Sequence, residues 1–102
     1  MKSTYKIIWS EEALSGLKEI ISYLEMRFSE KEIRKFIIIF DKQLDLIRSN
    51  PQMFPLSSRS KNVRRSIIGK LTSLYYFVDQ DAVKIIAIHD NRKNPDNLKI
   101  HR

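Results

Sequence analysis

Cysteine is absent from this 102-residue chain, and glycine and proline are scarce, with two and three residues. Without cysteine the chain has neither a disulfide framework nor a thiolate metal site, and a reducing compartment is favoured. The longest uninterrupted apolar run, residues 36–40, is far shorter than the ~20 residues that span a bilayer. The N-terminus also has no apolar stretch of signal-peptide length. We therefore expect a cytoplasmic protein without membrane association, folded as one domain over residues 1–102.

Positive charge, in contrast, is abundant and unevenly placed. The chain has 19 Lys and Arg against 12 Asp and Glu, a net charge of +7. Residues 59–70 contain five of these basic residues and no acidic one, whereas residues 1–58 are nearly balanced. Such a segment favours contact with phosphates or with an acidic partner protein. A solvated basic surface without a partner is the alternative.

Hydrophobic spacing predicts one strand, two helices and three further strands, in that order. Residues 4–9 alternate like a strand, and Ser10 is a typical N-cap for a helix. Apolar residues then recur at helical spacing, with a predicted capping box at residues 29–32, until Pro51 ends the second helix. A loop follows, and the remaining strands are expected over residues 63–68, 71–78 and 83–89.

This order predicts an α+β domain in which a helical hairpin packs on one face of a four-stranded, mainly antiparallel sheet. Three apolar residues of the second helix, Ile38, Ile39 and Leu46, lie off its main apolar stripe. Two explanations are open. Either contact with the sheet buries much of the girth of this helix, or the three residues form a binding face for a partner.

The order of elements and several local segments resemble the RelE/ParE family of bacterial toxins. The resemblance spans nearly the whole chain and rests on residues 9–13, 20–23, 50–55, 63–65, 74–76 and 83–95. It implies a toxin of a type II toxin–antitoxin module, with growth inhibition and plasmid stabilization as its roles. It also implies neutralisation by a cognate antitoxin that has an acidic, amphipathic tail.

The resemblance leaves the mechanism open between two branches. ParE-like members interfere with DNA gyrase, whereas RelE-like members cut messenger RNA on the ribosome. Cleavage of RNA without a metal needs cations to stabilise the phosphoryl charge and groups that move protons. The resemblance places these cations near Arg64, at position 73, and at Arg92 or Lys93; position 73, an arginine in RNA-cutting members, is Ser73 here. That difference, and the absence of tyrosine after Tyr76, favour the ParE-like branch.

A RelE-like endoribonuclease and a member without toxicity remain alternatives, so whether the protein is an enzyme stays open. If it cuts RNA, the catalytic candidates are Arg64, His89 and Arg92, although a structural role for His89 is the simpler explanation. Arg64 and Arg65 alternate faces on a strand, and salt bridges to helix acids are their alternative role. No metal and no cofactor is expected. The candidate functional basic patch comprises Arg59, Lys61, Arg64, Arg65, Arg92 and Lys93, and the candidate antitoxin-binding residues are Ile38, Ile39 and Leu46.

Overall fold

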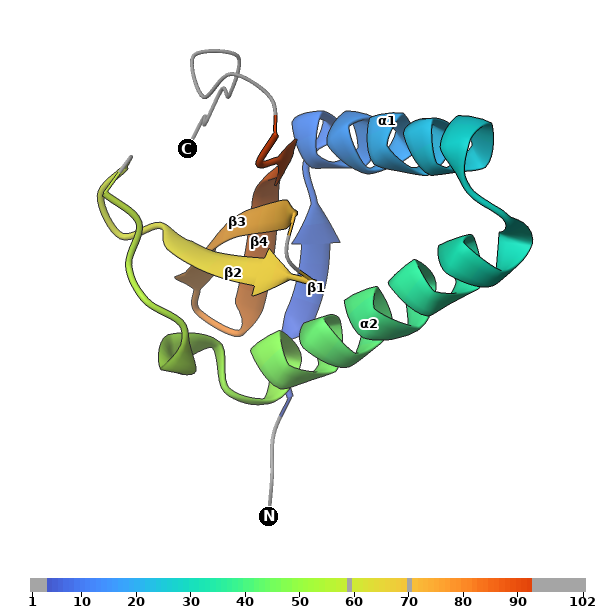
Figure 1. The fold of residues 1–102 in the computed structure, drawn as a ribbon. Helices are drawn as coiled ribbons and strands as arrows, with labels where there is room; N and C mark the ends of the chain where they lie inside the picture. The colour runs from blue at the N-terminus through green and yellow to red at the C-terminus, as the bar shows by residue number, and fades with distance from the viewer. Residues whose placement is uncertain (1–3, 59, 70, 93–102) are drawn as a thin grey trace.

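The computed structural model of the chain describes residues 4–58, 60–69 and 71–92 (Figure 1). The predicted succession of one strand, two helices and three strands is confirmed, as is the α+β class. The strand boundaries lie within two residues of those expected from the sequence. The elements are β1 (Lys6–Trp9), α1 (Glu11–Arg27), α2 (Glu30–Ser49), the 3-10 turn η1 (Pro51–Met53), β2 (Arg64–Ile68), β3 (Thr72–Asp79) and β4 (Ala82–Asp90).

The four strands form one mixed sheet in the order β1-β4-β3-β2. Strands β2, β3 and β4 make an antiparallel meander, and β1 pairs in parallel with β4. The ladder between β3 and β4 is interrupted by a bulge, because Tyr75 pairs with Ala87 while Tyr76 pairs with Ile85. The extra residue, Ile86, shifts the alternation of side chains in the second half of β4.

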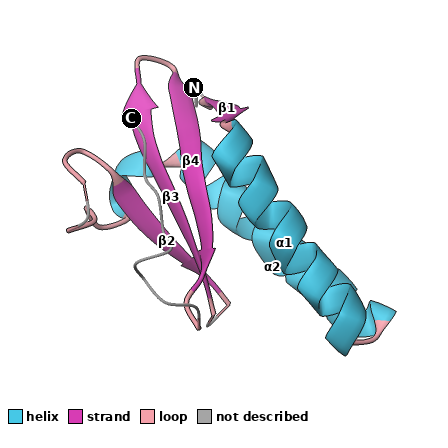
Figure 2. Cartoon of the chain, turned by 90° about the horizontal axis from the view of Figure 1, so that it is seen from above, coloured by secondary structure: helices cyan, strands magenta, loops and turns pink. Residues whose placement is uncertain are grey.

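Both helices lie on the same face of the sheet (Figure 2). The hydroxyl of Ser10 accepts a hydrogen bond from the Ala13 amide at 3.0 Å, which confirms the predicted N-cap of α1. Helix α1 then packs closely on β4 at Gly16. A Cβ added at Gly16 would lie 2.4 Å from the carbonyl oxygen of Ile88, so only glycine fits at this crossing. The helix-side core also includes Tyr76, which is fully buried.

Helix α2 is less buried than it would be if contact with the sheet covered much of its girth. Only Phe40 and Ile47 are buried along it, whereas the side chains of Ile38, Ile39 and Leu46 are 53%, 43% and 46% exposed. The idea that the sheet buries much of the girth of this helix is therefore wrong. The reason is geometric: α1 and α2 run apart from their connection (Figure 1), and it is α1 that packs against β4.

The predicted capping box at the start of α2 is also wrong. Ser29 is the N-cap, but its side chain makes no capping hydrogen bond. The amides of Glu32 and Ile33 instead both donate to the Ser29 backbone carbonyl, at 3.1 Å each. A main-chain acceptor thus takes the amide that the serine hydroxyl was expected to satisfy.

The sheet face turned away from the helices carries a second, smaller apolar cluster. Val63, Tyr75, Ile86 and Ala87 are buried there, and Phe77 packs against them. The sheet therefore has a helix side and an outer side, and each side carries an apolar cluster of its own. In the described part of the chain, no helix is both long and apolar enough to cross a membrane.

Candidate functional site

The structure does not bring the described basic candidates together on one face. Arg59 and Lys93 lie outside the described residues. Lys61 is exposed in the loop before β2. Of the other three cations, Arg64 is on the helix side of the sheet, Arg65 on the outer side, and Arg92 follows β4 beside α1.

Arg64 is bound to the backbone of the turn after α2. Its guanidinium donates hydrogen bonds to the carbonyl oxygens of Phe54, at 2.6 Å, and of Gln52, at 3.2 Å. The hydroxyl of Tyr76 donates to the Pro51 carbonyl at 2.5 Å in the same region. Burial raises the pKa of Tyr76 to about 12, and the positive charge of Arg64 opposes this rise. Backbone carbonyls are therefore the partners of Arg64, in place of the helix acids that were the alternative role for this residue.

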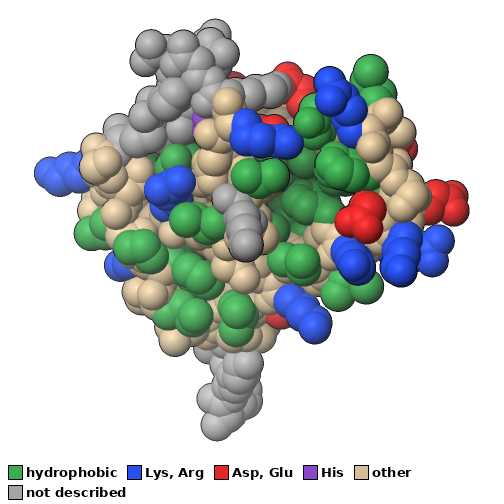
Figure 3. All heavy atoms as spheres, in the orientation of Figure 1, with side chains coloured by type: hydrophobic (Ala, Val, Ile, Leu, Met, Phe, Trp, Pro, Cys, Tyr) green, Lys and Arg blue, Asp and Glu red, His purple; other side chains and the backbone are tan. Residues whose placement is uncertain are grey.

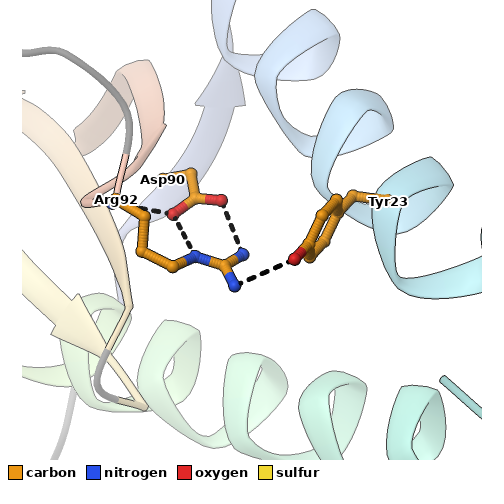
Figure 4. A network of polar contacts seen from close by, with 3 residues as sticks. All are labelled: Tyr23, Asp90 and Arg92. Carbon is orange, nitrogen blue, oxygen red and sulfur yellow. Dashed lines mark hydrogen bonds and ion pairs between the residues drawn. The ribbon is translucent and has the colours of Figure 1, made fainter. Parts of the chain in front are cut away.

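Arg92 joins the end of β4 to α1 (Figure 4). Its Nε and one terminal nitrogen contact the two carboxylate oxygens of Asp90 at 3.0 and 2.7 Å, and its other terminal nitrogen donates to the Tyr23 hydroxyl at 3.1 Å. The guanidinium carbon also lies 4.6 Å from the centre of the Tyr23 ring. Hydrogen bonding to Asp90 raises the pKa of Arg92. Its charge is thus balanced within the protein by Asp90, although the Arg92 side chain remains 41% exposed.

Arg65 points along the outer face of the sheet toward Ser73. Its Nε donates to the Ser73 hydroxyl oxygen at 2.9 Å, and that hydroxyl donates to Oδ1 of Asn91 at 2.7 Å. Ser73 is fully buried, whereas Arg65 and Asn91 are partly exposed. A chain of hydrogen bonds therefore links β2, β3 and the residue that follows β4.

His89 lies directly opposite Ser73 in the β3–β4 ladder, on the same outer face. Arg65 pairs with Tyr75, two residues from Ser73, which makes Arg65 and Ser73 diagonal neighbours. Position 73 therefore lacks an arginine in the sequence, yet it is contacted by a guanidinium from the adjacent strand. The sequence analysis did not predict this contact. It could have been predicted only from the register of β2 against β3.

Among the described residues, no cluster of three or more His, Asp or Glu side chains could hold a metal ion.

Exposed hydrophobic side chains form the other unusual surface. Figure 3 shows hydrophobic side chains recessed between the two helices, with Lys, Arg, Asp and Glu side chains around them. On α1 and its C-terminal end, Leu14 and Phe28 are 43% and 45% exposed. On α2, Ile38, Ile39 and Leu46 are likewise exposed to a similar degree.

Comparison with known proteins relates this fold to one family. A model described as "ParE toxin of type II toxin-antitoxin system, parDE" matches residues 7–95. The solved "Chromosomal ParDE TA system from P. aeruginosa" is similar, with a TM-score of 0.72 and 16% identity, covering 84% of this chain and 95% of that one. A protein from Helicobacter pylori, HP0894, has a TM-score of 0.58 and 18% identity, with 87% and 97% of the two chains covered.

The YoeB dimer from Staphylococcus aureus has a TM-score of 0.55 and 20% identity, covering 81% of this chain and 92% of that one. At these identities the solved structures show a shared fold. No curated protein matches the chain by sequence.

Proposed function

Because this chain belongs to the ParE toxin family of type II toxin–antitoxin systems, we propose that it inhibits bacterial growth by binding DNA gyrase. The family match over residues 7–95 carries the proposal. We further propose that a cognate antitoxin holds the toxin inactive. The fold shared with the ParDE system from P. aeruginosa supports that partnership.

The partner surface for the antitoxin is the exposed side of α2. Ile38, Ile39 and Leu46 present apolar area to water there, and an amphipathic segment would remove that area from water. The net charge of +7 favours an acidic partner, so binding is expected to weaken as salt increases. A tail that folds on this surface would offset its ordering entropy with the apolar area buried.

Binding to gyrase, without cleavage of RNA, is supported by the way two catalytic candidates are used. Arg64 is committed to backbone carbonyls of a turn, and Arg92 is paired with Asp90 and Tyr23. Neither guanidinium is presented on the outer face. The sequence also contains no tyrosine after Tyr76 that could take part in proton transfer.

One observation favours a second candidate function, RelE-like cleavage of messenger RNA. Arg65 contacts Ser73, and His89 lies opposite Ser73 on the same face. A guanidinium could stabilise phosphoryl charge there, and an imidazole is suited to proton transfer. This candidate uses Arg65 and His89 in place of Arg64 and Arg92.

The two functions are separated by parallel assays on the purified toxin. Gyrase supercoiling is expected to fall as toxin is added, and primer extension on ribosome-bound message is expected to show no cuts. Discrete cuts that disappear with Arg65→Ala would establish the RelE-like function instead. Supercoiling that is unaffected at a large excess of toxin would refute gyrase as the target.

The antitoxin surface is tested with matched isoleucine variants. Ile38 and Ile67 are 53% and 49% exposed, but Ile67 is on the outer face of β2. Burying the exposed half of an isoleucine contributes about 1 kcal/mol, so Ile38→Ala is expected to weaken antitoxin binding about fivefold in calorimetry. Ile67→Ala is the control and should bind as the wild type does. Equal affinity for both variants would place the antitoxin elsewhere.

A further inference from the structure

The hydrogen-bond chain on the outer face has only one possible direction. The Nε of Arg65 is a donor without an acceptor function, so the Ser73 oxygen must accept from it. The Ser73 hydroxyl hydrogen is then directed to Asn91, and the Asn91 atom at 2.7 Å is its carbonyl oxygen. The amide nitrogen of Asn91 is consequently left as a donor. Both ends of the chain therefore present N–H groups.

Arg65 differs from the other described arginines in what its terminal nitrogens contact. Arg34, Arg48 and Arg92 each pair with a carboxylate, Arg64 donates to two carbonyls, and the exposed Arg27 lies 5.4 Å from the centre of the Tyr23 ring. In the part of the chain that the structure describes, the side chain of Arg65 has a single hydrogen bond, from Nε, and no carboxylate partner. A partly buried guanidinium without a counter-ion is costly, and binding of an anion would offset that cost.

From these contacts we infer that Arg65, Ser73 and Asn91 form an oxyanion site that binds the phosphate group of a nucleotide or of a nucleic-acid backbone. Ser73 fixes the guanidinium by its Nε, which leaves the two terminal nitrogens to form parallel hydrogen bonds to two phosphate oxygens. The side-chain amide of Asn91, which directly follows β4, is a third donor. The site goes beyond the proposed gyrase inhibition and requires no cleavage.

Phosphate suits this site because, among the described residues, no carboxylate pairs with Arg65. The acid nearest in sequence, Asp90, is directed to the helix side, where it pairs with Arg92. His89, opposite Ser73, is on the outer face with Arg65. A tetrahedral anion with several acceptor oxygens can contact donors from both ends of the chain at once, which a single acceptor could not.

The probes are inorganic phosphate and a 2′-O-methyl RNA hexamer, which resists cleavage, titrated into ¹⁵N-labelled toxin. The Arg65 Nε–H and Asn91 side-chain amide resonances are expected to shift with saturation for both probes. If the hexamer binds more than about tenfold tighter than phosphate, the ligand is a nucleic-acid backbone; similar affinities indicate free phosphate or a nucleotide. No shift at either residue with either probe would overturn the inference.

Variants distinguish phosphate binding at this site from general attraction of phosphate to a positively charged protein. Arg65→Lys keeps the charge but cannot bond Ser73 and also offer two parallel donors, so phosphate affinity should fall roughly tenfold. Lys18→Ala removes an exposed charge from α1 and should change affinity less than about twofold. Asn91→Ala is a second variant, at a strand end, should Arg65→Lys fail to fold. Equal losses in the site variants and Lys18→Ala would refute the site, whatever the gyrase and antitoxin assays show.

Discussion

Replacing Arg64 by alanine removes two side-chain hydrogen bonds between β2 and the segment that follows α2. The bond to the Gln52 carbonyl is exposed and should contribute little. The bond to the Phe54 carbonyl is 2.6 Å long and partly buried. A hydrogen bond with a charged donor contributes about 1.5–3 kcal/mol net, so we expect a loss of about 2 kcal/mol in the free energy of unfolding. For a domain of this size that corresponds to a fall of about 10 °C in Tm.

Thermal and denaturant unfolding of Arg64→Ala measure this loss, with Arg34→Ala as the matched control. Arg34 is an exposed helix residue that pairs with Glu30 at 3.6 Å, so its removal should cost about 0.5 kcal/mol or less. Both variants lose the same charge. If the two midpoints coincide within about 2 °C, the structural role of Arg64 is refuted. If Arg64→Ala is both less toxic and less stable, its lost toxicity reports on the turn and not on a phosphate contact.

Two further substitutions test the packing. Gly16→Ala should destabilise the protein by about 1–3 kcal/mol in denaturant unfolding, despite the better helix propensity of alanine, because the added Cβ meets the Ile88 carbonyl oxygen; unchanged stability would show that α1 can move away. Tyr76, with its pKa raised to about 12 from 10.0, should stabilise the fold below pH 10 and lose that contribution as the pH rises from 10 to 12. Tyr76→Phe should therefore lose less stability than the wild type over that interval, and parallel pH profiles would contradict the assignment.

The sequence predicted the elements because their signals are local. Alternation and helical spacing report on which residues share a face, and the Ser10 cap involves an amide three residues away. The capping box at Ser29 failed because the backbone carbonyl of the same residue took the amide bond. Residue pattern alone does not decide between these two acceptors.

The partners of the basic residues could not be predicted in the same way. Arg92 meets Tyr23 across 69 positions of sequence, and Arg65 meets Ser73 only because β2 and β3 pair in a particular register. The exposure of α2 likewise depends on the angle between two helices, which helical periodicity does not encode. Charge in the sequence identified candidate residues, and the fold decided which of them are neutralised internally.

The bulge at Ile86 determines which sign of charge each side of the sheet receives near the end of β4. With uninterrupted alternation after Ile85, Ala87 and His89 would face the helices, and Asp90 would emerge on the same side as Arg65. A carboxylate beside that guanidinium would compete with any incoming anion. The one inserted residue instead directs Asp90 toward Arg92, so the bulge keeps this carboxylate on the side of the sheet opposite to Arg65.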